Sequence, residues 1–171
     1  MERALVVYES MFGNSERVAR AVASGIREVL PVDLVEVTHA PSVLDDYTLV
    51  VVGGPTHAFT MSRAATRRDA REQGAAYGSV GEGLREWLAA LPQNGPHLRF
   101  ASFDTRVTRG RRLPGSASRS AARSARRHGL REVAEPESFY VESVSGPLAA
   151  GELDRAHTWG ATVASTVPAA A

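Results

Sequence analysis

The chain has 171 residues, of which 43% are hydrophobic and 23% charged, as expected for one globular domain, residues 1–171, with a single core. No apolar run approaches the roughly 20 residues needed to cross a bilayer, and the N-terminal segment lacks the regions of a secretory signal, so we expect a cytoplasmic location. The absence of cysteine excludes disulfides, thiolate catalysis and iron–sulfur clusters. Redox chemistry would therefore depend on a bound cofactor.

The first third of the chain alternates between short apolar runs and one amphipathic segment. Residues 4–8 form a continuous apolar run typical of a buried parallel strand. Apolar residues then recur at helical spacing between Val18 and Leu30, which predicts a helix. Residues 32–37 and 49–52 predict the second and third strands, the latter ended by Gly53-Gly54-Pro55.

The remaining elements continue this alternation. Residues 60–78 are polar and rich in arginine, and they predict an inserted loop with a short helix. The fifth strand is expected to be interrupted near Pro136 because proline donates no ladder hydrogen bond. Further predictions are helices at 80–91, 116–128 and 152–167, strands at 98–103 and 133–144, and a frayed end at 168–171.

Strands that alternate with helices predict an α/β fold with a parallel sheet covered on both faces. In such doubly wound folds ligands bind beyond the carboxyl ends of the strands. The element order alone does not separate the possible doubly wound folds, so the loops that follow the strands must decide.

The loop Ser10-Met11-Phe12-Gly13-Asn14-Ser15 follows the first strand and leads into a helix. Its glycine permits a tight turn, and the N–H groups and dipole of the helix start favour an anion. A Walker phosphate loop is excluded because the chain contains no lysine, and the dinucleotide fingerprint needs two further glycines. The simpler alternative is that Asn14 or Ser15 only caps the helix.

Residues 8–16, Tyr-Glu-Ser-Met-Phe-Gly-Asn-Ser-Glu, resemble the FMN phosphate loop of flavodoxins, Thr/Ser-x-Thr-Gly-x-Thr. Ser10, Gly13 and Ser15 match this pattern, while Phe12 replaces a hydroxyl residue, as in the flavodoxin-like domains of flavodiiron proteins. The element order also resembles that of short-chain flavodoxins over nearly the whole chain. The resemblance implies a five-stranded parallel sheet of order 2-1-3-4-5 and an FMN cofactor.

Two further loops match this family in part. The segment after the third strand resembles the Gly-x-Pro-Thr loop that contacts the flavin ring, where His57 or Phe59 would lie against the ring face. The loop after the fourth strand lacks the usual tyrosine shield, and Arg106 is the expected replacement. The implied cofactor-binding residues are Ser10, Met11, Phe12, Gly13, Asn14, Ser15, Pro55, Thr56, His57, Ala58, Phe59, Phe103, Asp104, Thr105 and Arg106.

The charge distribution departs from that of flavodoxins, which carry an acidic rim around the flavin. Nine arginines and no acidic residue lie between Thr105 and Arg131. Positive charge near a flavin favours its reduced anionic form and raises its midpoint potential. The same surface suggests an acidic redox partner or a small anionic or quinone acceptor, the alternative being a solvated basic face. Nucleic-acid binding is not expected because interleaved aromatic residues are absent.

Three functions remain open at this point. The first is an FMN-binding electron-transfer protein, and the second is a small FMN-dependent NAD(P)H or quinone reductase. The third is a degenerate domain without FMN that acts as a binding module. No residue stands out as a catalytic acid or base, and the scattered histidines show no metal-ligand spacing.

Overall fold

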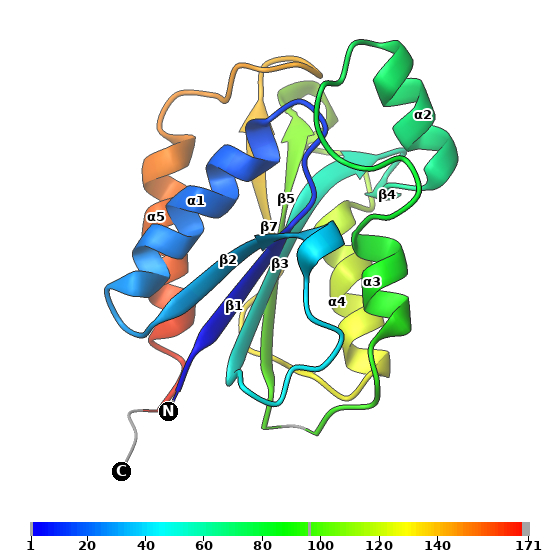
Figure 1. Cartoon of the computed structure of the whole chain (residues 1–171). Coiled ribbons are helices and arrows are strands. Elements are labelled where there is room, and N and C mark those ends of the chain that lie inside the picture. The colour runs from blue at the N-terminus through cyan, green and yellow to red at the C-terminus, as the bar shows by residue number, and fades with distance from the viewer. Residues whose placement is uncertain (1, 96, 169–171) are drawn as a thin grey trace.

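A computed structural model of the protein describes residues 2–95 and 97–168 and shows a parallel sheet between two helical layers (Figure 1). The strands are β1 (Ala4–Tyr8), β2 (Val32–Glu36), β3 (Leu49–His57), β4 (Thr60–Met61), β5 (Arg99–Val107), β6 (Arg131–Glu132) and β7 (Glu137–Val141). The helices are α1 (Asn14–Arg27), α2 (Ala64–Glu72), α3 (Leu84–Ala90), α4 (Ala117–Arg127) and α5 (Glu152–Ala164), with short 3-10 turns at Val37–His39 and Thr108–Gly110.

The sheet has the order β2-β1-β3-β5, and the fifth position is shared by β6 and β7. All these pairs are parallel, whereas β4 pairs antiparallel with the end of β3. The predicted doubly wound fold with order 2-1-3-4-5 is therefore confirmed. The gap between β6 and β7 contains Pro136, at the predicted interruption of the fifth strand.

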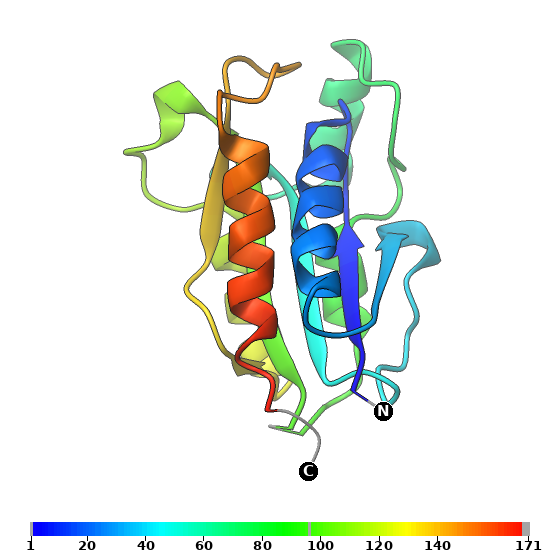
Figure 2. The ribbon, with the colours of Figure 1, turned by 90° about the vertical axis from the view of Figure 1, so that its left-hand side faces the viewer.

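Two helical layers cover the sheet. Helices α1 and α5 lie side by side on one face (Figure 2) and pack against β-strand side chains such as Val6 and Val51. Gly25 and Gly160 allow this close approach, because a Cβ on either glycine would lie 2.0–2.2 Å from a carbonyl oxygen of the opposite helix. Helices α3 and α4 cover the other face, where Phe100 is completely buried.

Strands β3 and β5, which correspond to the predicted third and fourth strands, are longer than the sequence predicted. Gly53 and Gly54 lie inside β3 rather than ending it, because both are places of close packing. A Cβ on Gly53 would lie 1.9 Å from the Phe103 ring, so this strand position admits only glycine. The prediction that a glycine turn ends this strand at Val52 was wrong, and β5 likewise continues from Phe103 to Val107.

The segment 60–78 contains β4 and α2, followed by a return loop. Helix α3 begins at Leu84 rather than near Val80, because the carbonyl groups of Val80 and Gly81 accept hydrogen bonds from the Arg67 side chain. The predicted frayed end, 168–171, lies outside the described residues from position 169 onward.

Candidate functional site

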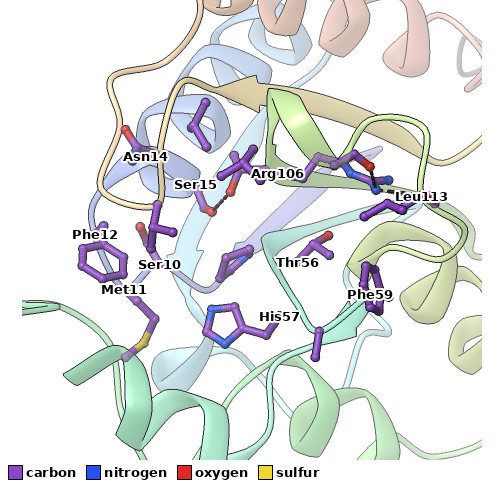
Figure 3. A pocket seen from close by; sticks show the side chains of 17 residues that line it. Ser10, Met11, Phe12, Asn14, Ser15, Thr56, His57, Phe59, Arg106 and Leu113 are labelled. Atoms are coloured by element: carbon purple, nitrogen blue, oxygen red, sulfur yellow. Dashed lines mark hydrogen bonds between the residues drawn. The ribbon is translucent and has the colours of Figure 1, made fainter. Parts of the chain in front are cut away.

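A cavity of about 280 Å³ lies at the carboxyl ends of β1, β3 and β5, where doubly wound folds bind ligands (Figure 3). Three loops from well-separated parts of the sequence enclose it, together with residues that follow β7. Its lining is Ser10, Met11, Phe12, Asn14, Ser15, Pro55, Thr56, His57, Ala58, Phe59, Thr105, Arg106, Val107, Gly110, Leu113, Val141 and Val144.

Twelve of the fifteen residues implied by the sequence line this cavity, and three do not. Gly13 forms the bend of the loop 10–15 and lies behind the lining. This loop is called the phosphate loop below, after the motif that it resembles. Phe103 is buried in the core against Phe139 and Trp159. The buried Asp104 carboxylate accepts hydrogen bonds at Oδ2 from the N–H and hydroxyl of Ser118 in α4, and its Oδ1 has no partner within the described residues.

The phosphate loop leads into a set of backbone donors at the start of α1. Gly13 has φ = 93°, a left-handed conformation that favours glycine, and its N–H donates to Ser10 Oγ at 3.1 Å. Within the described part of the chain, the N–H groups of Asn14, Ser15 and Glu16 have no hydrogen-bond partner. These groups open helix α1, where the helix dipole adds positive potential, so the loop is suited to an anion.

Neighbouring segments hold the phosphate loop in this shape. The hydroxyls of Ser15 and Thr105 are 2.6 Å apart, which joins the start of α1 to β5. The return loop of the insertion contributes a second clamp, because Tyr77 N–H donates to the carbonyl of Met11. Gly78 packs so closely that a Cβ there would lie 2.8 Å from Ser10 O. The loop is therefore preorganised on both sides.

A strained two-residue turn joins β3 to β4 and forms another wall of the cavity. Ala58 and Phe59 have φ values of 47° and 66°, which non-glycine residues rarely adopt and which cost free energy. The loop between β5 and α4 packs against this turn, because a Cβ on Gly115 would lie 2.7 Å from the carbonyl oxygen of Phe59. The Phe59 ring remains 54% exposed at the cavity mouth, available to a flat ligand.

His57 lies on the same wall, in surroundings that disfavour its protonated form. Burial, and then the positive charge of Arg67, lower the pKa of His57 below its ordinary value. Its Nδ1 atom is 3.1 Å from the hydroxyl of Thr66 in α2, so the insertion orients the ring. Figure 3 shows the His57 and Phe59 rings on opposite sides of Thr56.

Arg106 provides the guanidinium group of the cavity. It donates hydrogen bonds to the carbonyls of Gly110 and Leu113, which folds the loop after β5 back over the strand. Its Nε is buried and has no hydrogen-bond partner within the described residues. A buried donor without a partner beside a cavity is costly unless a ligand satisfies it.

Sequence reasoning did not select Val107, Val141 and Val144 for the site. Val141 ends β7 and pairs with Val107, while Val144 lies in the following loop and is 59% exposed. The predicted fifth strand contained both Val141 and Val144, but no polar motif marked them as cavity residues. Gly110 and Leu113 also line the cavity, from the loop that follows β5.

A buried polar cluster supports the insertion just outside the cavity. Arg67 is completely buried and donates to Ser62 Oγ and to Glu86, which forms an ion pair with it. Glu9, at the end of β1, accepts from the Ser62 hydroxyl and from the N–H of Leu84. Burial raises the pKa of Glu9, against the opposing effects of these hydrogen bonds and of Arg67.

Across residues 2–95 and 97–168, no helix combines the length and apolar character required to cross a membrane. No three potential metal ligands among His, Asp and Glu are grouped in that part of the chain.

Comparison with known proteins agrees with this geometry. The Flavodoxin family model matches residues 6–87, from β1 into α3. Flavodoxin 1 from Bacillus cereus superposes with a TM-score of 0.71 at 16% identity, covering 98% of this chain and 100% of that chain. A flavodoxin from the domain Archaea gives 0.66 at 20% identity, covering 96% and 98%. No curated protein sequence matched the chain.

The same fold occurs inside larger proteins. The flavodiiron core from Synechocystis superposes with a TM-score of 0.64 at 14% identity, covering 97% of this chain but 36% of that chain. The fold and the site define a doubly wound α/β protein with a ligand cavity at the carboxyl edge of its sheet. The chain therefore has a flavodoxin-like fold, and its N-terminal half, residues 6–87, matches the Flavodoxin family model.

Proposed function

We propose that this protein binds FMN in the cavity at the carboxyl ends of β1, β3 and β5 and transfers electrons through it. The observation that carries the proposal is the set of unpartnered N–H groups at Asn14, Ser15 and Glu16, which lies beside a largely apolar cavity. A phosphate and an attached flat ring need this combination of an anion site and an apolar slot.

The residues present fit the phosphate end of FMN. Backbone N–H groups would donate to the phosphate oxygens, and the Ser15 hydroxyl would add a donor held in place by Thr105. Phe12 supplies no hydroxyl, so the backbone carries most of this binding. Gly13 allows the bend that points these donors to one centre.

The remaining walls fit the ring. His57 and Phe59 would flank it from the turn between β3 and β4, and burial of the two flat surfaces would remove water from both. The unpartnered Nε of Arg106 would donate to an electronegative atom of the ring. When bound, FMN supplies the electron-transfer chemistry, and the protein contributes binding, orientation and electrostatics.

The direct test is the visible spectrum of the purified protein, followed by titration of the flavin-free protein with FMN. The proposal expects a yellow protein, or quenching of FMN fluorescence with a 1:1 endpoint. Riboflavin, which lacks the phosphate, should bind much more weakly. A colourless protein that takes up no FMN would support instead a degenerate domain that acts as a binding module.

The apolar rim of the cavity favours a second candidate, an FMN-dependent reductase acting on a quinone. Phe59, Leu113 and Val144 are each about half exposed and all line the same cavity. Exposed apolar side chains around a cavity are suited to a flat hydrophobic acceptor as well as to a partner protein.

Steady-state kinetics of the FMN-loaded protein separates these two functions. A reductase would oxidise NAD(P)H in the presence of a soluble quinone with saturation in both substrates. An electron carrier would show little such turnover but would accept electrons rapidly from a reductase protein. Its partner would be an acidic protein if the arginine-rich surface takes part in docking.

A further inference from the structure

A second hollow, of about 380 Å³, lies between β4, α3 and α4 on the face of the sheet opposite α1 and α5. It shares no lining residue with the cavity of the proposed FMN site, which is called the flavin cavity below. The hollow is mostly polar, whereas the flavin cavity is mostly apolar. Four arginines converge on it from three separate segments of the chain, namely the residue before α2, α3 and α4. The lining residues are Thr60, Met61, Arg63, Arg85, Ala89, Ser120, Arg123, Ser124 and Arg127.

Arg85 is fixed in position at the side of this hollow. Its Nε donates to the carbonyl of Ser62 at 3.1 Å, and its Nη2 donates to the carbonyl of Met61 and the hydroxyl of Thr60. Within the described residues Nη1 makes no hydrogen bond, which leaves donors free. The guanidinium is therefore held by neutral acceptors, and it forms no ion pair within the described residues.

No carboxylate lines this hollow. The two acidic groups nearest to Arg85 are engaged elsewhere, because Glu86 pairs with Arg67 and Glu9 accepts from Ser62 and Leu84. Burial, and then the charge of Arg63, lower the pKa of Arg85. The neighbouring Arg126, which lies outside the lining, forms an ion pair with Glu132.

Helix α4 presents its arginines and hydroxyls on the face that borders this hollow. Ser120 and Ser124 are four residues apart, as are Arg123 and Arg127, and the two pairs are offset by three residues, so all four border one side of the helix. The hydroxyls of Ser120 and Thr60 are 2.9 Å apart, which ties α4 to β4. Hydroxyl and guanidinium groups are suitable hydrogen-bond donors to phosphate oxygens.

We propose that this hollow is a binding site for a small anion carrying two or more phosphate groups, such as the diphosphate of a nucleotide. The arginines Arg63, Arg85, Arg123 and Arg127 surround a concave space instead of a flat face, which suits a compact polyphosphate better than the side chains of an acidic protein. Planar guanidinium groups bind phosphate oxygens in pairs, so four of them recognise more than charge alone.

The site adjoins the flavin cavity through a single turn. Phe59 lines the flavin cavity and the next residue, Thr60, lines the arginine hollow. A ligand in the hollow would therefore contact the base of the turn that carries His57 and Phe59. The proposal does not depend on FMN binding, because the four arginines and their surroundings belong to other elements.

The test uses sodium pyrophosphate, ADP and inorganic phosphate, added at constant ionic strength to the FMN-treated full-length protein. Binding is followed by isothermal titration calorimetry and by the thermal unfolding temperature. We expect pyrophosphate and ADP to bind and to raise the unfolding temperature, with phosphate weaker than both. Poly-glutamate should have little effect, and equal stabilisation by poly-glutamate would overturn the assignment to a phosphate ligand.

The critical variant is Arg123→Gln combined with Arg127→Gln, because both side chains are exposed and neither makes an ion pair within the described residues. It should weaken pyrophosphate binding by roughly tenfold or more, since two charge-assisted contacts are removed. Arg27→Gln with Arg68→Gln is the matched control, which removes the same charge from exposed positions outside the lining. Equal binding by the two double variants would place the anion elsewhere, including the phosphate loop, and would refute the proposal.

Discussion

The hydroxyl oxygens of Ser15 and Thr105 lie 2.6 Å apart and join the first turn of α1 to the end of β5. These residues are 90 positions apart in the sequence, and both are buried. Their contact couples the proposed phosphate site to the strand that carries Arg106. A change at one loop should therefore be transmitted to the other.

Thr105→Val tests this coupling, because valine keeps the shape of the side chain and removes only the hydroxyl. The loss of one buried hydrogen bond costs about 0.5–1.5 kcal/mol, so FMN should bind roughly two- to tenfold more weakly. Fluorescence titration measures this change. The control Thr162→Val removes an exposed hydroxyl in α5, which donates only within its helix, and should leave the affinity unchanged. Unaltered FMN affinity in Thr105→Val would contradict the coupling.

The phosphate loop gives a second prediction through its backbone. Gly13 and Gly74 have similar left-handed φ values of 93° and 96°, so alanine strains both positions by about 1–2 kcal/mol. The Gly74 position has open space around it, and it lies outside the cavity lining. Gly13→Ala and Gly74→Ala should therefore lower the free energy of unfolding by similar amounts.

FMN binding should distinguish the two alanine variants. Only Gly13→Ala shifts the bend that directs the N–H groups of α1, so only this variant should bind FMN more weakly. The alanine strain is relieved by distorting the loop, and each 1.4 kcal/mol of binding free energy lost in this way weakens the affinity about tenfold. Urea unfolding and FMN titration of both proteins give the comparison. If both variants bind FMN equally well, the bend at Gly13 does not form the phosphate site.

The alternation of strands and helices predicted a doubly wound sheet, and the resemblance of the loops to those of flavodoxins then implied the sheet order and the position of the cavity. Each strand is a short apolar run, and the loops that follow β1 and β3 contain recognisable motifs. The strand ends were harder to predict, because Gly53 resembles a turn residue in the sequence and only the Phe103 ring explains its place inside β3. The insertion of α2 likewise depends on Arg67, whose burial no local pattern indicates.

The arginine hollow was not predicted as a site for a related reason. Arg63 precedes α2, Arg85 lies in α3 and Arg123 lies in α4, and each looks like an ordinary solvated charge in its own segment. The basic run between Thr105 and Arg131 was visible in the sequence, but the different surroundings of its arginines in the fold were not. Arg106 faces the cavity, Arg126 forms an ion pair, and Arg127 borders the hollow.

Glu9 gives a prediction for the pH dependence of stability. Burial raises its pKa above the ordinary value of about 4.3–4.5, so the folded protein retains this proton at a pH where the unfolded chain has lost it. The contribution of Glu9 to stability is therefore fully present below the ordinary pKa. It is lost as the pH rises through the raised pKa.

Glu9→Gln removes this titration and retains groups able to bond with Ser62 and the N–H of Leu84. Relative to the wild type, the variant should gain stability as the pH rises from 4.5 to 7.5, by about 1.4 kcal/mol for each unit by which the pKa is raised. Urea unfolding at several pH values measures the difference. A difference that stays constant, or that falls with rising pH, would show that the ion-pair environment of Arg67 outweighs burial at Glu9.

Arg106 gives the final prediction, which concerns the midpoint potential of bound FMN. A positive charge at the cavity stabilises negative charge on the reduced flavin, so Arg106→Gln should lower the potential. A loss of about 1.4 kcal/mol corresponds to about 30 mV for a two-electron couple.

Because Arg106 also holds the carbonyls of Gly110 and Leu113, loss of loop order is a competing cause. Arg106→Lys separates the two causes, since lysine keeps the charge but not the planar fork. Potentiometric titration should therefore give a wild-type-like potential for Arg106→Lys and a lower one for Arg106→Gln, whereas equal shifts in both variants would assign the effect to the loop.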